Sequence, residues 1–140
     1  DDAMTWCLGS QFWAKNQHYT DVRPRYAILL DMVGGPGARF CYEGYSLRYA
    51  QSVVDKVWSA AERAGYSDFF PREDGGYITD DHVPLNEAGL PTIDIIPYYR
   101  NTTTGFCPTW HTVSDTPEHI DKNSLKAAGQ TLLQVIYEEK

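Results

Sequence analysis

A single acidic residue at the end of an apolar run is the first feature that could carry chemistry. The run covers residues 26–33 and is interrupted only by Asp31, directly before the glycine-rich turn at 34–37. A buried carboxylate is costly unless it is paired or bound to a metal, and α/β enzymes gather their sites at the carboxyl ends of strands. Asp31 is therefore a candidate site residue. It could equally emerge at the sheet edge or cap the glycine turn.

A second cluster lies in the tetrapeptide Thr79–His82, where Asp80 and Asp81 directly precede a histidine. Two carboxylates beside an imidazole form a candidate cluster for metal binding or proton transfer. Adjacent side chains often point in different directions, so at most two of the three are expected to share one site. An ordinary polar turn before Pro84 would explain the stretch equally well.

The third candidate is His111, which follows Trp110 in the irregular stretch 98–119. Neutral imidazole is a common zinc ligand, and a rigid tryptophan beside it either packs in the core or forms a pocket wall. Asp115 is more typical of a turn and helix entry, because it is a natural capping residue. A cysteine protease pair of Cys107 and His111 is disfavoured, since the sequence offers no evident group to orient the histidine.

The elements that must position these residues follow from the apolar spacing. The sequence predicts two buried strands over 26–33 and 92–97, helices over 5–16, 46–65 and 122–139, and one helical turn over 84–89. Strands that alternate with helices predict an α/β fold. Two strands make a thin sheet for three helices to cover, which is typical of a part of a larger fold.

Composition and charge exclude several classes of function. The net charge of −7 argues against nucleic acid or an anionic membrane as a partner, because both require a basic face. No run of 18 apolar residues exists, so no membrane span is predicted. The three cysteines form no C-x-x-C pair, which disfavours a cysteine zinc knuckle and predicts buried thiols. The chain opens without an initiator Met or a targeting segment, as a fragment or a processed product does.

Read together, the three clusters resemble the C-terminal half of the zinc exopeptidase family that includes leucine-type aminopeptidases and glutaminyl cyclases. The resemblance rests on an ordered set of short motifs: Leu30-Asp31-Met32-Val33-Gly34, Asp80-Asp81-His82-Val83-Pro84, Trp110-His111-Thr112 and Asp115-Thr116. It covers nearly the whole chain. It implies that residues 1–140 are half of one domain, with part of a mixed, mostly parallel sheet flanked by helices.

The resemblance also implies roles for four residues. His111 matches a zinc ligand. Asp31 matches an aspartate that binds a second zinc in the aminopeptidases but hydrogen-bonds another carboxylate in the single-zinc cyclases. Asp80 matches that other carboxylate, and one pKa of such a pair is expected to be raised. Trp110 matches a pocket tryptophan of the cyclases. The resemblance therefore favours zinc-dependent cyclisation of N-terminal glutamine, with peptide or protein N-termini as substrates.

The sequence also departs from the family. Another histidine, an aspartate and a pair of adjacent glutamates that complete the site in relatives cannot be assigned here, and Asp94 stands where animal cyclases carry a histidine. A di-zinc aminopeptidase and an inactive fragment or binding module therefore remain alternatives. We expect these 140 residues alone to show no turnover and to bind zinc weakly. Bacterial relatives are often exported, so a periplasmic or secreted location is expected.

Overall fold

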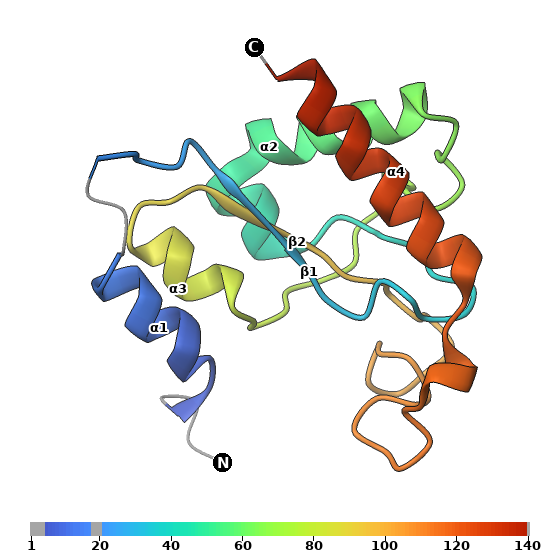
Figure 1. The fold of residues 1–140 in the computed structure, drawn as a ribbon. Helices are drawn as coiled ribbons and strands as arrows, with labels where there is room; N and C mark the ends of the chain where they lie inside the picture. Colours follow the sequence, from blue (N-terminus) through green and yellow to red (C-terminus); the bar gives the residue numbers. More distant parts are fainter. Residues whose placement is uncertain (1–4, 18–20, 140) are drawn as a thin grey trace.

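The computed structural model describes residues 5–17 and 21–139 and shows helices packed around a short parallel sheet (Figure 1). In chain order its elements are α1 (Leu8–Lys15), β1 (Ala27–Leu30), α2 (Gly44–Arg63), α3 (His82–Glu87), β2 (Thr92–Ile95), the 3-10 helix η2 (Pro117–His119) and α4 (Lys122–Glu138). The predicted α/β class and the alternation of strands with helices are confirmed. None of the helices in the described part of the chain is long and apolar enough to cross a membrane.

The sheet consists of β1 and β2, which pair in parallel with Leu29 level with Asp94 and Leu30 level with Ile95. The backbone pairing continues for one residue, because the Asp31 N–H donates to the Ile95 carbonyl at 3.2 Å. All four residues of β2 are buried, as expected for a strand covered on both faces. Both strands are shorter than the apolar runs that predicted them, since the runs continue into the turns that follow.

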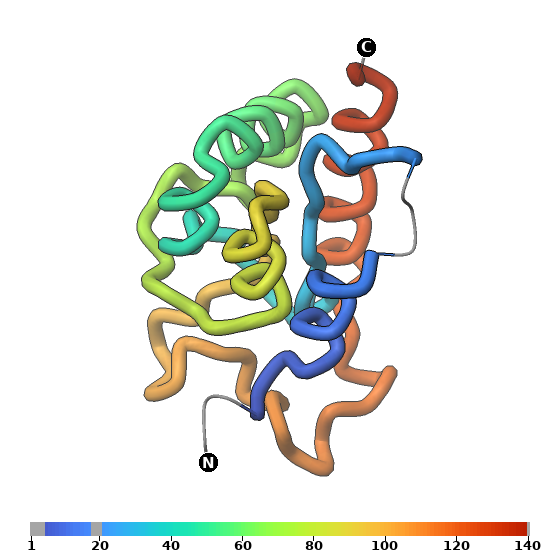
Figure 2. Tube along the Cα trace, turned by 90° about the vertical axis from the view of Figure 1, so that its left-hand side faces the viewer, coloured from blue at the N-terminus to red at the C-terminus, as the bar shows by residue number. Residues whose placement is uncertain are grey.

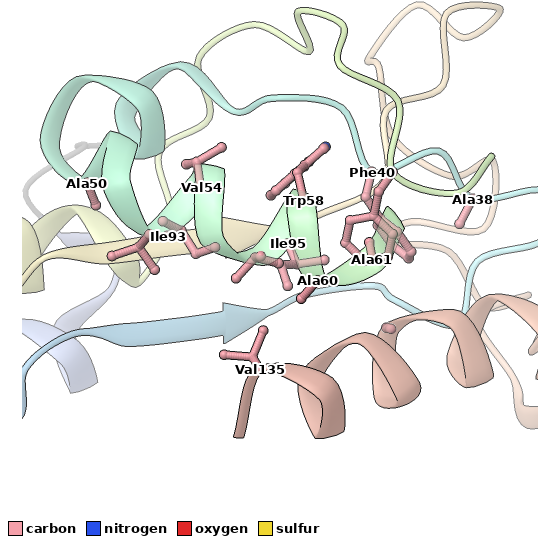
Figure 3. Packing of buried hydrophobic residues seen from close by; sticks show 14 residues of the cluster. Ala38, Phe40, Ala50, Val54, Trp58, Ala60, Ala61, Ile93, Ile95 and Val135 are labelled. Atoms are coloured by element: carbon pink, nitrogen blue, oxygen red, sulfur yellow. The ribbon is translucent and has the colours of Figure 1, made fainter. Parts of the chain in front are cut away.

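The hydrophobic core lies between β2, α2 and α4 (Figure 3). Its fully buried members alternate along β2 and recur at helical spacing along α2. They include Ile93, Ile95, Val54, Val57, Trp58, Ala61, Ala128 and Val135. Because Ile93 and Ile95 face this core, the intervening Asp94 must point to the opposite face of the sheet.

The ends of the helices follow local side-chain chemistry. Glu43 caps α2 by accepting from the N–H groups of Tyr45 and Ser46, and Gly65 follows this helix with a φ of 82°, a left-handed conformation that favours glycine. The predicted turn at 84–89 begins two residues earlier, at His82. Pro84 is tolerated there because the first N–H groups of a helix have no partner within it.

The stretch 98–119 is irregular as predicted, apart from the single turn of η2. Figure 2 shows this stretch as the orange loops at the bottom of the molecule, whereas α4 ends at the top. Helix α1 lies against α3. The loop ends that follow β1 and precede α3 therefore meet the irregular stretch at one end of the sheet.

Candidate functional site

One cavity of about 430 Å³ gathers the four residues that the sequence singled out. Asp31, Asp80, Trp110 and His111 all line it, although they come from three separate segments. The other lining residues are Trp6, Cys7, Ile78, Thr79, Ile96 and Phe106. The lining contains two aspartates but no lysine or arginine, so its fixed charge is negative.

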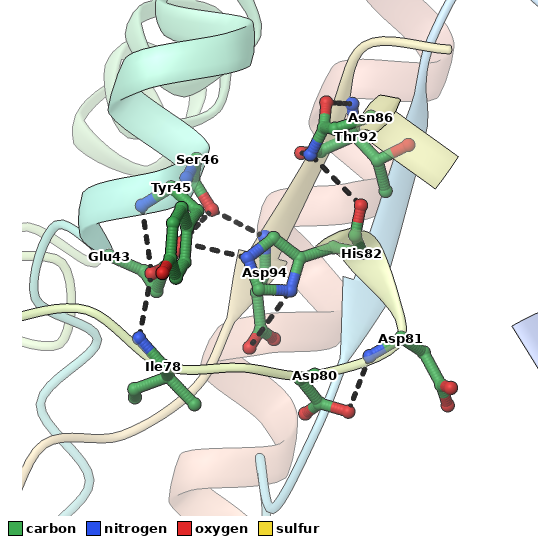
Figure 4. A network of polar contacts seen from close by, with 10 residues as sticks. All are labelled: Glu43, Tyr45, Ser46, Ile78, Asp80, Asp81, His82, Asn86, Thr92 and Asp94. Atoms are coloured by element: carbon green, nitrogen blue, oxygen red, sulfur yellow. Dashed lines mark hydrogen bonds and ion pairs between the residues drawn. The ribbon is translucent and has the colours of Figure 1, made fainter. Parts of the chain in front are cut away.

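The strand register explains why acidic side chains meet at this cavity. Asp94 is level with Leu29 in the sheet, and Asp31 comes two residues after Leu29. Since side chains alternate along a strand, Asp94 and Asp31 lie on the same face. Asp80 approaches that face from the loop before α3 (Figure 4).

The carboxyls of Asp31 and Asp80 are neighbours at the cavity, and the charge of Asp80 acts on Asp31. Burial raises the pKa of Asp31, and the neighbouring charge of Asp80 raises it further, while a hydrogen bond from the Met32 backbone opposes the rise. Two neighbouring carboxylates repel each other when both are ionised, and a shared proton or a nearby positive charge would relieve that repulsion. The coupled pair that the resemblance implied stays a prediction.

Trp110 and His111 form the opposite wall of the cavity. Their rings stack with centroids 4.1 Å apart and planes 19° apart, and Phe106 packs on Trp110 at 4.5 Å. His111 is exposed and has a φ of 54°, a left-handed conformation that is uncommon outside glycine. The imidazole is thus accessible to a metal, and its ring is flanked by an aromatic surface.

His82 does not line this cavity, although it adjoins the Asp80-Asp81 pair in the sequence. It is fully buried: its Nε2 lies 2.9 Å from Glu43 Oε2, and its Nδ1 lies 3.9 Å from Asp94 Oδ2 (Figure 4). His82 therefore separates from the two aspartates, whose carboxylate oxygens lie within 4.8 Å of one another, so two of the three residues stay together. His82 belongs to a polar network behind the cavity.

Asp94 is the most perturbed carboxyl of this network. It is fully buried, and neither of its carboxyl oxygens has a hydrogen-bond partner. Burial raises its pKa to about 9, and the nearby carboxylates raise it as well. These are Asp80, Asp31, Glu43 and Asp81, in order of decreasing effect. Asp94 therefore holds a proton at neutral pH.

Glu43 belongs to the same polar network as His82, and the sequence interpretation missed it. A carboxylate directly before a helix signals an N-terminal cap, and that signal was available in Glu43-Gly44-Tyr45-Ser46. Its links to His82 and to the loop before α3 span more than 30 residues. No local pattern could have revealed them.

The donor chemistry of the cavity fits a metal cation. His111 offers an imidazole, Asp31 and Asp80 offer carboxylates, and the crowded acidic groups would be relieved by a positive charge. Among the described residues, however, the group of donor atoms within 4.8 Å of one another comes from Cys7, Asp80 and Asp81 and includes neither His111 nor Asp31. Burial and the two aspartates raise the pKa of Cys7 to about 11, so this thiol stays protonated and is a poor ligand.

The chain was compared with known proteins. Peptidase family M28 matches residues 4–136. Aminopeptidase YwaD of Bacillus subtilis (strain 168) is 36% identical over 137 residues, which cover 88% of this chain and 28% of that protein. The glutaminyl cyclase of Bacteroides thetaiotaomicron bound to N-acetylhistamine superimposes with a TM-score of 0.92 and 54% identity, over 96% of this chain and 46% of that one.

A Zn-dependent exopeptidase from Parabacteroides distasonis ATCC 8503 superimposes with a TM-score of 0.93 and 50% identity, over 99% of this chain and 48% of that one. This chain therefore spans about half the length of these solved relatives, and about a quarter of the curated aminopeptidase. The match over 4–136 and the similarity to solved relatives agree with the observed architecture. The chain belongs to peptidase family M28.

Proposed function

We propose that the protein containing this chain is a zinc-dependent glutaminyl-peptide cyclotransferase, which converts an N-terminal glutamine to pyroglutamate and releases ammonia. The observation that carries this proposal is the pairing of Asp31 and Asp80 at one cavity, where the charge of Asp80 raises the pKa of Asp31. A carboxyl that shares a proton with its neighbour is poorly suited to bind a second divalent ion. The likeness to solved glutaminyl cyclases supports the same choice.

Within this proposal, His111 is one ligand of the metal, and the remaining ligands come from outside these 140 residues. Bound zinc would polarise the side-chain carbonyl of the substrate's glutamine. The α-amine of the same residue forms a bond to the side-chain carbonyl carbon, and the bond from that carbon to the amide nitrogen breaks. The attack is intramolecular, so the protein mainly has to orient the side chain and assist proton movement.

The residues of this chain meet those two needs. Trp110 lines the cavity, with Phe106 tilted against it and His111 stacked on it, and offers an apolar surface to the folded glutamine side chain. The attacking amine loses a proton and the departing ammonia gains one. The role we assign to the Asp31–Asp80 pair is to share a proton beside the cavity and keep it available during the exchange.

The test uses the full-length protein, a peptide that begins with glutamine and a matched peptide that begins with leucine. The cyclase proposal expects ammonia release from the first peptide, with a product lighter by one ammonia, and no release of free leucine from the second. Zinc content should be close to one per protein. Free leucine without ammonia release, or two tightly bound zinc ions, would overturn the proposal.

A di-zinc aminopeptidase is the second candidate, favoured by the 36% identity to the Bacillus subtilis aminopeptidase. In that case Asp31 binds the second zinc, the proton shared with Asp80 is displaced, and a metal-activated water hydrolyses the first peptide bond. The same two peptides and the same zinc measurement separate the two candidates.

A further inference from the structure

Glu43 is a buried carboxylate, 2% exposed, that bonds to two separate parts of the chain. Within its own helix, it accepts from the Tyr45 N–H at 2.9 Å and from the Ser46 N–H at 2.6 Å. Outside the helix, it accepts from the Ile78 N–H at 3.0 Å and lies 2.9 Å from His82 Nε2. Figure 4 shows the carboxylate between the start of α2 and the loop that leads into α3.

This carboxylate stays ionised despite its burial. Burial by itself would raise the pKa of Glu43, but hydrogen bonds from His82, Ser46 and the backbone of Ile78 and Tyr45 together lower it. Hydrogen bonds to an ionised acceptor are stronger than those between neutral groups. The two contacts outside the helix, to Ile78 and His82, are therefore strong enough to hold the loop in place.

The two attachments fall on either side of Asp80. Ile78 precedes Asp80 by two residues, and His82 follows it by two. The loop is fixed at one more point, because the Gly44 N–H donates to the Gly76 carbonyl at 2.7 Å. Asp80 itself has no bond to Glu43 among the described contacts, so its carboxyl is free to face Asp31 across the cavity.

We infer that Glu43 is a positioning residue for the reaction: by holding Ile78 and His82 it fixes the backbone that presents Asp80 to Asp31. This inference rests on the proposed function for its catalytic consequence. Small displacements of a proton-transfer group lower turnover strongly. Glu43 does not line the cavity, so it acts through the loop and not on the substrate.

The sharpest test is Glu43→Asp in the full-length protein. Aspartate is as good a helix cap as glutamate and keeps the charge, but its carboxylate is shorter by one methylene, about 1.5 Å. The contacts inside α2 can therefore survive while those to Ile78 and His82 are lost. We expect kcat to fall ~10–100-fold with KM nearly unchanged, while the melting temperature changes by only a few degrees.

Two further variants separate positioning from stability. Glu138→Asp makes the same shortening at an exposed carboxylate of α4 that pairs with Arg63, and it should leave kcat unchanged. Glu43→Gln keeps the full length, so its amide oxygen can still accept from Ile78, but its NH₂ group would oppose the Ser46 N–H. We expect Glu43→Gln to be less stable than Glu43→Asp and yet more active per folded molecule.

Hydrogen exchange provides a readout that does not depend on turnover. The Ile78 amide should exchange about 10-fold faster or more in Glu43→Asp than in the wild type, because it loses a bond to a charged acceptor. Unchanged exchange, or a kcat that follows the melting temperature across all variants, would overturn the inference. If the wild type turns over neither peptide, the proposed function fails, and the exchange of Ile78 still decides the role of Glu43.

Discussion

Replacing Asp94 with asparagine should change how the stability of the protein depends on pH. Asp94 is fully buried, and burial raises its pKa to about 9 from an ordinary value of 3.8. The unfolded chain releases this proton near pH 3.8, whereas the folded chain keeps it up to about pH 9. Folding therefore takes up a proton between these values, so the Asp94 contribution to stability falls as the pH rises.

The magnitude follows from the number of protons involved. One proton bound on folding lowers the free energy of unfolding by about 1.4 kcal/mol per pH unit. Asparagine has a similar shape but is neutral at every pH, so the Asp94→Asn protein lacks this slope. Relative to the wild type, the variant should therefore gain about 2–3 kcal/mol between pH 6 and pH 8.

Urea unfolding of the full-length protein at pH 6, 7 and 8, with a chelator present to remove metal, measures this difference. Taking the difference between wild type and variant at each pH cancels the titration of groups that both proteins share. Wild-type and variant curves that run parallel would refute the reasoning. That result would mean that Asp94 takes up no proton on folding over this pH range.

Three further predictions concern the metal, the cavity wall and the core. Removing zinc from the full-length protein should abolish turnover and adding zinc should restore it, whereas His111→Ala should stay inactive at zinc concentrations that saturate the wild type. Trp110→Ala should raise KM about 10-fold or more through lost contact area while zinc content is unchanged, as kinetics and metal analysis would show. Ile93→Ala should lower the free energy of unfolding by about 2–5 kcal/mol in denaturant unfolding, because it leaves a cavity in the core. Val113→Ala, at a side chain that is 99% exposed, should change the free energy of unfolding by less than about 0.5 kcal/mol.

The secondary structure was largely predictable because its signals are local. The apolar run over 26–33 and the spacing along 46–65 each identify an element within a few residues of its observed bounds. The residues at which these helices and strands begin and end were less predictable. A proline is most typical of the first helical position, but Pro84 occupies the third position of α3, so the helix begins two residues before the predicted start.

The candidate site was predictable for a different reason. Asp31, Asp80 and His111 are polar groups in places where burial would be costly, and they do line one cavity. Which side chains turn toward that cavity was not predictable, because His82 is adjacent to the acidic pair yet turns into the interior. The network of Glu43, His82 and Asp94 depends on contacts between distant segments, which carry no periodic signal in the sequence.

The left-handed backbone at His111 has a consequence for metal affinity. A non-glycine residue in this left-handed conformation lowers the stability of the fold by on the order of 1 kcal/mol. Favourable contacts of the surrounding loop must offset this cost when the chain folds. If His111 is the zinc ligand that we propose, its imidazole already points into the cavity beside Trp110 before any ion arrives. Zinc binding then does not have to reorganise the loop. The unfavourable conformation therefore lowers the stability of the fold slightly but does not lower the affinity for zinc.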